Sequence, residues 1–318
     1  MRYDDKDQES KNVEDRRGQG GGFGGMPGGF QLPTGGRGGM SLTSLLIIGA
    51  IMLLFGINPL DILTGGGGAN FPNIQLPQQE TTQRPSSGPN IPGLPGEGRT
   101  TTASSDEMKV FIGRVLADTE QVWNKVFQSF GENYKEPQLV IFSGGTRTAC
   151  GVGQTQMGPF YCPIDQKIYI DLAFYDELKR RFNAPGDFAQ AYVVAHEVGH
   201  HVQTLLGIAE KVQDLKQRMS ERESNALQVR MELQADCLAG VWANLNHQLN
   251  NRLEPGDIEE GLRAANAIGD DMIQKKTQGH VVPDAFTHGS AEQRMRWFTN
   301  GYKSGKMQAC DTFNTDDL

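Results

Sequence analysis

The sequence predicts an α+β fold: a mainly helical domain with a small β-sheet over residues 105–318, preceded by segments that lack a compact fold. Short apolar runs near the start of the domain have the length of strands, and the apolar residues from residue 173 onward recur mostly at helical spacing. Glycine and proline are concentrated in the first hundred residues, so the count of 40 glycines in the whole chain overstates the glycine content of the domain.

Residues 1–40 are charged at first and then rich in glycine, with the run GQGGGFGGMPGGFQLPTGGRGGM. Such a composition buries too little apolar surface to offset the entropy of ordering the chain. We therefore predict a disordered leader over residues 1–40. Residues 64–104 are rich in Gly, Pro, Ser and Thr and are predicted to form a linker.

Residues 41–63 are apolar, and no polar side chain interrupts the run from Leu45 to Ile57. The stretch from Ser41 to Leu60 has about the 20 residues that a membrane-spanning helix needs. A buried core helix is one alternative, which the adjoining disordered sequence disfavours. A cleaved signal peptide is another, which the long leader and the lack of a clear cleavage site disfavour. We therefore predict an uncleaved, single-pass transmembrane anchor.

Basic residues around this segment predict its orientation. Arg37 lies just before it, Arg16 and Arg17 lie further back, and the next basic residue is Arg84. Because Lys and Arg favour the cytoplasmic side of a membrane, the N-terminus is predicted in the cytoplasm and everything after Leu63 outside it. A secreted protein is the alternative if the segment is cleaved.

The folded domain is predicted to begin near Ser105, because Ser104 and Ser105 followed by two acidic residues form a helix start signal. The stretches QLVIF at 138–142 and KIYIDL at 167–172 are predicted strands, with FYC at 160–162 as a third. Besides the first helix, which continues to about residue 127, helices are expected at 173–182, 187–206, 218–249, 256–275 and 290–302.

The charge balance excludes one class of partner. The net charge is −8 and the pI is near 5.3, with no stripe of basic residues. Binding to phosphate backbones needs clustered Lys and Arg, so nucleic acid is not expected to be a partner.

Three of the six histidines lie in the stretch VVAHEVGHHVQTLLG. His196 and His200 are four residues apart, so both imidazoles project from one face of the predicted helix and can bind zinc together. Glu197 lies beside that face and can serve as general base for a zinc-activated water, as in the HExxH pattern. His201 points about 100° away and is interpreted as a supporting residue, not a ligand.

A catalytic zinc usually takes a third protein ligand. Gln203 and Leu206 stand where the metzincin pattern needs Gly and His, which excludes that class. Glu232 and Asp236 lie four apart within an apolar stretch and need partners if they are buried. We predict that Glu232 is the third ligand and that Asp236 accepts a hydrogen bond from a ligand histidine. A solvated helix face or an ordinary salt bridge is the alternative.

The motifs HEVGHHVQ and ELQADCLAG resemble the gluzincin arrangement, HExxH followed by ExxxD on a later helix, as in the CAAX-type prenyl proteases. With TACGVGQTQMGPFYCPIDQKIYIDLAFYDEL and FTHGSAEQRMRWFTNGYKSG…CDTF, they resemble the bacterial "putative neutral zinc metallopeptidase" family over roughly residues 105–318. The resemblance implies a zincin-like metallopeptidase domain, Zn²⁺, and a peptide or protein substrate. It also implies a bacterial inner-membrane protein with a periplasmic domain.

The motif FTHGSAEQRMRWF places His288 in a loop before the last long helix. Peptide hydrolysis needs a donor for the developing oxyanion besides the metal, and His288 is the catalytic candidate for this role. Arg294 is a candidate clamp for a substrate carbonyl or carboxylate. Alternatively, His288 caps local structure and Arg294 pairs with Glu292 or Asp236.

The four cysteines are Cys150, Cys162, Cys237 and Cys310, and none forms a CxxC pair, which argues against a thiolate zinc site. They permit two disulfides in an oxidising compartment. We favour Cys150–Cys162, which closes a short loop, and Cys237–Cys310, which ties the C-terminal tail to a site helix. Four buried free thiols are the alternative.

The sequence therefore predicts a membrane-anchored zinc endopeptidase, in which Glu197 takes a proton from water and passes it to the leaving amine. A zinc-containing envelope protein that only binds a partner, and a hydrolase of cell-wall amide bonds, are the alternatives. Glu197 favours an enzyme over the binding protein, because a structural zinc site needs no base and usually has four protein ligands.

Overall fold

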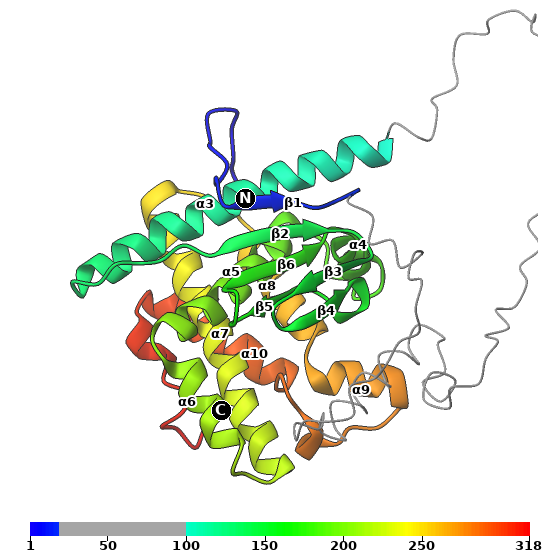
Figure 1. Cartoon of the computed structure of the whole chain (residues 1–318), viewed down its shortest axis with the longest axis vertical. Coiled ribbons are helices and arrows are strands. Elements are labelled where there is room, and N and C mark those ends of the chain that lie inside the picture. The colour runs from blue at the N-terminus through cyan, green and yellow to red at the C-terminus, as the bar shows by residue number, and fades with distance from the viewer. Residues whose placement is uncertain (19–99) are drawn as a thin grey trace, which may run out of the picture. The chain divides into compact units, whose positions relative to one another are not determined.

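The computed structural model describes residues 1–18 and 100–318, and within them it shows a mainly helical domain with a small mixed sheet. The sheet has the strand order β1-β2-β6-β5, formed by β1 (Val13–Asp15), β2 (Gln138–Phe142), β6 (Lys167–Asp171) and β5 (Phe160–Cys162) (Figure 1). The first three strands are parallel, and β5 is antiparallel to β6. A hairpin of β3 (Gly145–Thr148) and β4 (Gly151–Gln154) follows β2.

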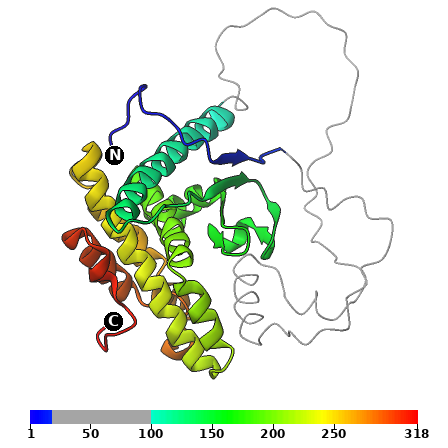
Figure 2. The same ribbon diagram turned by 60° about the vertical axis from the view of Figure 1, so that its left-hand side comes forward.

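The helices match the predicted positions with a few differences. They are α3 (Thr100–Ser129), α4 (Ala173–Arg180), α5 (Asp187–Leu205), α6 (Ile208–Lys216), α7 (Glu221–Asn250), α8 (Asp257–Ala267), α9 (Asp270–Gln278) and α10 (Ala291–Ser304). Single 3₁₀ turns lie at η1 (Thr155–Met157), η2 (Pro283–Ala285) and η3 (Met307–Cys310). In Figures 1 and 2, α5, α7 and α10 lie together beside the sheet, and α3 runs along its β1 end.

The central strands are buried on both faces, which is usual where parallel strands are covered on each side. One face of the sheet joins the main core with the helices, through the side chains of Leu139, Ile141, Ile168 and Ile170. The other face holds a smaller cluster that includes Val140, Phe142 and Tyr169. Phe160 stacks on Tyr169 with ring centroids 5.1 Å apart. A Cβ at Gly153 would lie 2.6 Å from the Phe160 ring, so the hairpin needs glycine there.

Helices α7 and α10 approach each other very closely. A Cβ at Gly240 of α7 would come 2.1 Å from the Phe298 carbonyl oxygen, and a Cβ at Gly301 of α10 would overlap the Cys237 carbonyl. The segment expected as one helix over 256–275 is two helices, α8 and α9. Gly269 lies at the break, where a Cβ would come 2.4 Å from the Ala291 nitrogen.

The expectation of disorder over residues 1–40 is wrong for residues 1–18. These residues and 106–318 belong to one compact unit, and β1 is a strand of the sheet. The Met1 α-amino group lies 2.7 Å from Asp187 Oδ2, at the first residue of α5, and 3.2 Å from Asp257 Oδ2. Polar and ionic contacts hold residues 1–18 on the domain, and such contacts cannot be read from amino-acid composition.

The rest of the predicted leader, the predicted anchor at 41–63 and most of the linker lie outside the described residues. Within residues 1–18 and 100–318, no helix is long and apolar enough to cross a membrane. Helix α3 begins at Thr100, ahead of the predicted domain start at Ser105.

Both favoured cysteine pairings are present as disulfides. Cys150, in the turn between β3 and β4, is bonded to Cys162 at the end of β5. Cys237 of α7 is bonded to Cys310 of η3, which fixes the C-terminal segment to the long helix.

Candidate metal centre

His196 and His200 lie one turn apart in the middle of α5, and their rings are 4.8 Å apart at an interplanar angle of 88°. The helix is buried along most of its length, and the side chains of His196 and His200 are 9% and 16% exposed, so both imidazoles are largely shielded from bulk water. Their Nε2 atoms turn toward the same carboxylate oxygen, Glu232 Oε2, at 3.2 Å from His196 and 3.4 Å from His200.

Glu232 comes from α7, which packs against α5 at a point where only small residues fit. A Cβ at Gly199 would lie 3.0 Å from the Ala235 carbonyl oxygen, so the glycine within HEVGH permits the close approach of the two helices. One nitrogen of each of the two histidines and one oxygen of Glu232 all lie within 4.8 Å of one another. The sequence prediction had placed these three side chains together, and the structure does so.

The second ring nitrogen of each histidine has a hydrogen-bond acceptor. His196 Nδ1 lies 2.8 Å from Asp236 Oδ1, and His200 Nδ1 lies 2.9 Å from Gln203 Oε1. An N–H at each Nδ1 leaves the Nε2 lone pairs free toward Glu232, which is the tautomer that a metal-binding histidine requires. Asp236 occupies the position predicted for it.

Asp236 is fully buried, and three groups share its carboxylate. Besides His196, the Tyr192 hydroxyl donates to Oδ1 at 2.5 Å, and the Arg294 guanidinium donates to both oxygens at 2.9 and 3.0 Å. Burial alone would raise the pKa of Asp236, but the Arg294 charge and the hydrogen bond from His196 lower it to about 2.

This placement favours one of the two roles considered for Arg294. Its side chain is 3% exposed, and its guanidinium also donates to the Tyr192 hydroxyl and to the Ile268 carbonyl. It therefore pairs with Asp236, as the alternative interpretation had it, and is not directed at a substrate. The substrate clamp expected at Arg294 does not agree with these contacts.

Glu197 follows His196 and is buried, with 7% of its surface exposed. Burial raises the pKa of its carboxyl group. A carboxylate with a raised pKa beside two candidate metal ligands suits a group that accepts and returns a proton.

His288 lies in the loop before α10, and its Nδ1 is 3.2 Å from Asp270 Oδ1. The other Asp270 oxygen accepts the backbone N–H groups of Thr287, His288 and Gly289, which fixes the loop. Half of the His288 side chain is exposed, and a positive charge on its imidazole lowers the pKa of Glu232.

His201 is fully buried and points away from this group. Its Nδ1 accepts from the Tyr161 hydroxyl at 3.0 Å, and its Nε2 donates to the Lys135 carbonyl at 2.6 Å. Burial lowers its pKa to about 4, so the ring is neutral. It joins α5 to β5, as expected of a supporting residue.

The sequence prediction gave no role at this site to three residues that take part in it: Gln203, Tyr192 and Asp270. Tyr192 stands four residues before His196, and Gln203 stands three after His200, so the helical i, i+3 and i, i+4 rule could have found both. Asp270 comes from a separate helix, and no local pattern links it to His288.

The donor set fits zinc. Two imidazole nitrogens and one carboxylate oxygen converge, with a buried acceptor behind each histidine. This is the usual protein ligand set of a catalytic zinc site that leaves one position open.

Comparison with known proteins agrees with this donor set. A family model described as "Putative neutral zinc metallopeptidase" matches residues 1–313. The chain belongs to this family. The family expected from the motifs is confirmed, and the match includes residues 1–18, well before the start at residue 105 that the motifs suggested.

Two relatives show how far the similarity to the metallopeptidase family extends. The uncharacterized protein YpfJ of Escherichia coli (strain K12) is 47% identical over 308 residues, which is 96% of each chain. The uncharacterized protein Rv2575 of Mycobacterium tuberculosis is 43% identical over 215 residues, 64% of this chain and 71% of the relative. No solved structure matches the chain.

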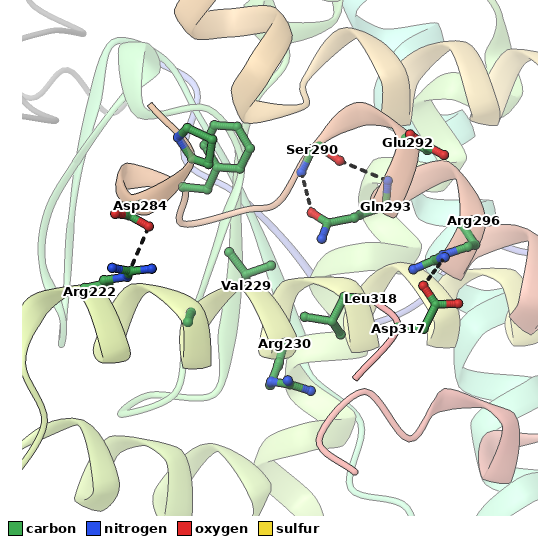
Figure 3. A pocket seen from close by; sticks show the side chains of 13 residues that line it. Arg222, Val229, Arg230, Asp284, Ser290, Glu292, Gln293, Arg296, Asp317 and Leu318 are labelled. Carbon is green, nitrogen blue, oxygen red and sulfur yellow. Dashed lines mark hydrogen bonds and ion pairs between the residues drawn. The ribbon is translucent and has the colours of Figure 1, made fainter. Parts of the chain in front are cut away.

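A pocket of about 600 Å³ lies between α7, η2 and the start of α10 (Figure 3). Val229 lines it, one helical turn before Glu232, and Phe286 and Ser290 line it on either side of His288. Figure 3 shows ion pairs along its walls, Arg222 with Asp284 and Arg296 with Asp317. The wall is therefore partly apolar and partly charged.

Proposed function

We propose that this protein is a zinc-dependent endopeptidase that hydrolyses peptide bonds at the His196–His200–Glu232 group. The main support is the convergence of two histidines and a glutamate from two helices, each histidine with a buried hydrogen-bond acceptor behind it. Membership of the metallopeptidase family agrees with this chemistry. The intact Glu197 beside the group favours a hydrolase over a structural metal site.

When bound there, zinc would lower the pKa of a water molecule and polarise the scissile carbonyl. Glu197 accepts the proton of the attacking water and returns it to the leaving amine. The Asp236 carboxylate keeps His196 in the tautomer with Nε2 free, and Gln203 does the same for His200. His288, held by Asp270, donates to the developing oxyanion.

The pocket beside α7 is the proposed position for a substrate side chain next to the cleaved bond. Its lining residue Val229 is one turn from Glu232, and its rim continues into the loop of His288. The two disulfides support a domain that works outside the cytoplasm, since a reducing compartment seldom retains them. Anchoring in a membrane through residues 41–63 stays a prediction.

Metal content and peptide cleavage of the purified full chain test this function together. Wild type should hold one zinc per chain and cleave members of a broad peptide library, and Glu197→Gln should keep the zinc and lose at least about 100-fold in rate. Glu232→Ala should lose zinc, while Glu221→Ala, which changes an exposed glutamate at the start of α7, should not.

Full cleavage by Glu197→Gln would refute the role of Glu197, and unchanged zinc in Glu232→Ala would refute the ligand set. Zinc without peptide cleavage in the wild type would favour a partner-binding protein or a cell-wall amide hydrolase.

A further inference from the structure

Residues 1–18, called here the N-terminal strap, are part of the fold along their length. β1 pairs in parallel with β2 at the edge of the sheet. Its ladder continues at both ends, where the Leu139 amide donates to the Asn12 carbonyl at 2.8 Å and the Arg16 amide donates to Ile141 at 2.7 Å. These bonds satisfy backbone groups that an exposed sheet edge would otherwise leave to solvent.

The strap also completes a buried ionic cluster of the domain. Arg252 lies 3.0 Å from Asp118 of α3 and 2.7 Å from Asp7 of the strap, and its guanidinium covers the Tyr3 ring at 4.5 Å. The Tyr3 hydroxyl donates to Asp118 at 2.9 Å. Asp118 is 5% exposed, and a buried carboxylate is costly unless it is paired, so the domain is built to receive these strap side chains.

A second carboxylate of α3 is paired in the same way. Glu120 Oε1 accepts from the Ser10 hydroxyl at 2.5 Å and from the Asn12 amide at 2.9 Å. On the same helix, a Cβ at Gly113 would come 3.0 Å from the Glu9 side chain, so the helix surface also fits the strap closely.

Two strap arginines that predicted a cytoplasmic N-terminus are engaged by the domain. Arg16 donates to the Thr146 hydroxyl and the Arg147 carbonyl, each at 3.4 Å, and Arg17 lies 3.0 Å from Asp106. These contacts add to those that hold the strap on the domain.

We infer that the N-terminal strap and the domain at 105–318 lie in the same compartment. A single membrane crossing between them would put the strap on the opposite face, where none of these contacts forms. Residues 41–63, if they enter a membrane, therefore do not leave the two parts on different sides. The disulfides favour the extracytoplasmic side for both. This inference does not depend on peptidase activity.

Thiol labelling of the full chain in intact bacterial cells tests the inference. Asp5→Cys places a thiol on an exposed residue of the strap, and Gln213→Cys places one on an exposed residue of α6. Each variant is treated with a membrane-impermeant maleimide before and after permeabilisation. The wild type, whose four cysteines are paired, gives the background.

Equal labelling of both variants in intact cells is the expected result and places both parts outside. Labelling of both only after permeabilisation also supports a shared compartment, but on the cytoplasmic side. Labelling of Gln213→Cys in intact cells with Asp5→Cys protected until permeabilisation would overturn the inference.

Amide hydrogen exchange of the purified full chain tests the docking itself. The Arg16 amide should exchange far more slowly than an unstructured peptide amide, because it is bonded to Ile141. Arg252→Gln, which removes the ion pairs to Asp7 and Asp118, should speed that exchange. Free exchange at Arg16 in the wild type would show an undocked strap and overturn the inference.

Discussion

The hydrogen bonds of Gln203 lead to a specific prediction about metal affinity. Its amide oxygen accepts from His200 Nδ1 at 2.9 Å, and its amide nitrogen donates to the Met231 carbonyl at 2.8 Å and to Gln234 at 3.0 Å. The bond to a backbone carbonyl fixes the orientation of the amide. Gln203 therefore determines which ring nitrogen of His200 faces the metal group.

Replacing Gln203 by Ala should weaken both zinc binding and the fold. Loss of an outer partner of a metal-binding histidine lowers metal affinity by about 10- to 100-fold, which is about 1.4 to 2.8 kcal/mol. The substitution also removes two buried hydrogen bonds and one that is partly buried. At about 1 kcal/mol each, their loss should lower the free energy of unfolding by about 3 kcal/mol.

Gln203→Glu separates the two effects. Its carboxylate still accepts from His200, so zinc affinity should stay close to wild type. The same carboxylate has no N–H to donate to the Met231 carbonyl. The free energy of unfolding of the metal-free protein should therefore fall at least as far as in Gln203→Ala.

Zinc affinity is measured by competition with a chromophoric chelator, and stability by urea unfolding of the metal-free protein. Gln213→Ala, at an exposed position of α6, is the matched control and should change neither. Wild-type zinc affinity in Gln203→Ala, or a large loss of affinity in Gln203→Glu, would refute the role of Gln203 as the partner that orients His200.

Three further predictions concern stability. Arg294→Ala leaves the buried Asp236 carboxylate without its cation and should cost about 3 to 5 kcal/mol in urea unfolding. Replacing Cys237 and Cys310 by Ser opens a loop closed across a sequence separation of 73 residues and should cost about 4 kcal/mol. Removing zinc with a chelator should lower the free energy of unfolding by about 4 kcal/mol relative to a sample whose free zinc is about 1,000 times Kd, seen as a lower Tm.

Matched variants check these values. Arg296→Ala breaks an ion pair to the exposed Asp317 and should cost under about 1 kcal/mol. A cost for Arg294→Ala as small as this would contradict the buried pairing. Serines at Cys150 and Cys162 open a loop across a separation of only 12 residues and should cost less, about 3 kcal/mol. A Tm unchanged by the chelator would contradict a metal bound to the folded state.

The sequence by itself determined the parts of the fold whose signal is local. The apolar runs at 138–142 and 160–162 are strands with those bounds, and the helix at 187–206 differs from α5 by one residue. The candidate ligands His196 and His200 followed from their spacing alone. Glu232 followed from a second i, i+4 pair in an apolar helix, because buried carboxylates need partners.

Only the tertiary structure decided which distant groups meet. The pairs Arg294–Asp236 and His288–Asp270 join different helices and loops. Helical or strand spacing in the sequence therefore does not predict them. The N-terminal strap was predicted to be disordered, because its composition supports no apolar core. It is ordered by backbone bonds to β2 and by ion pairs to Arg252, and these depend on groups that only the folded chain brings into reach.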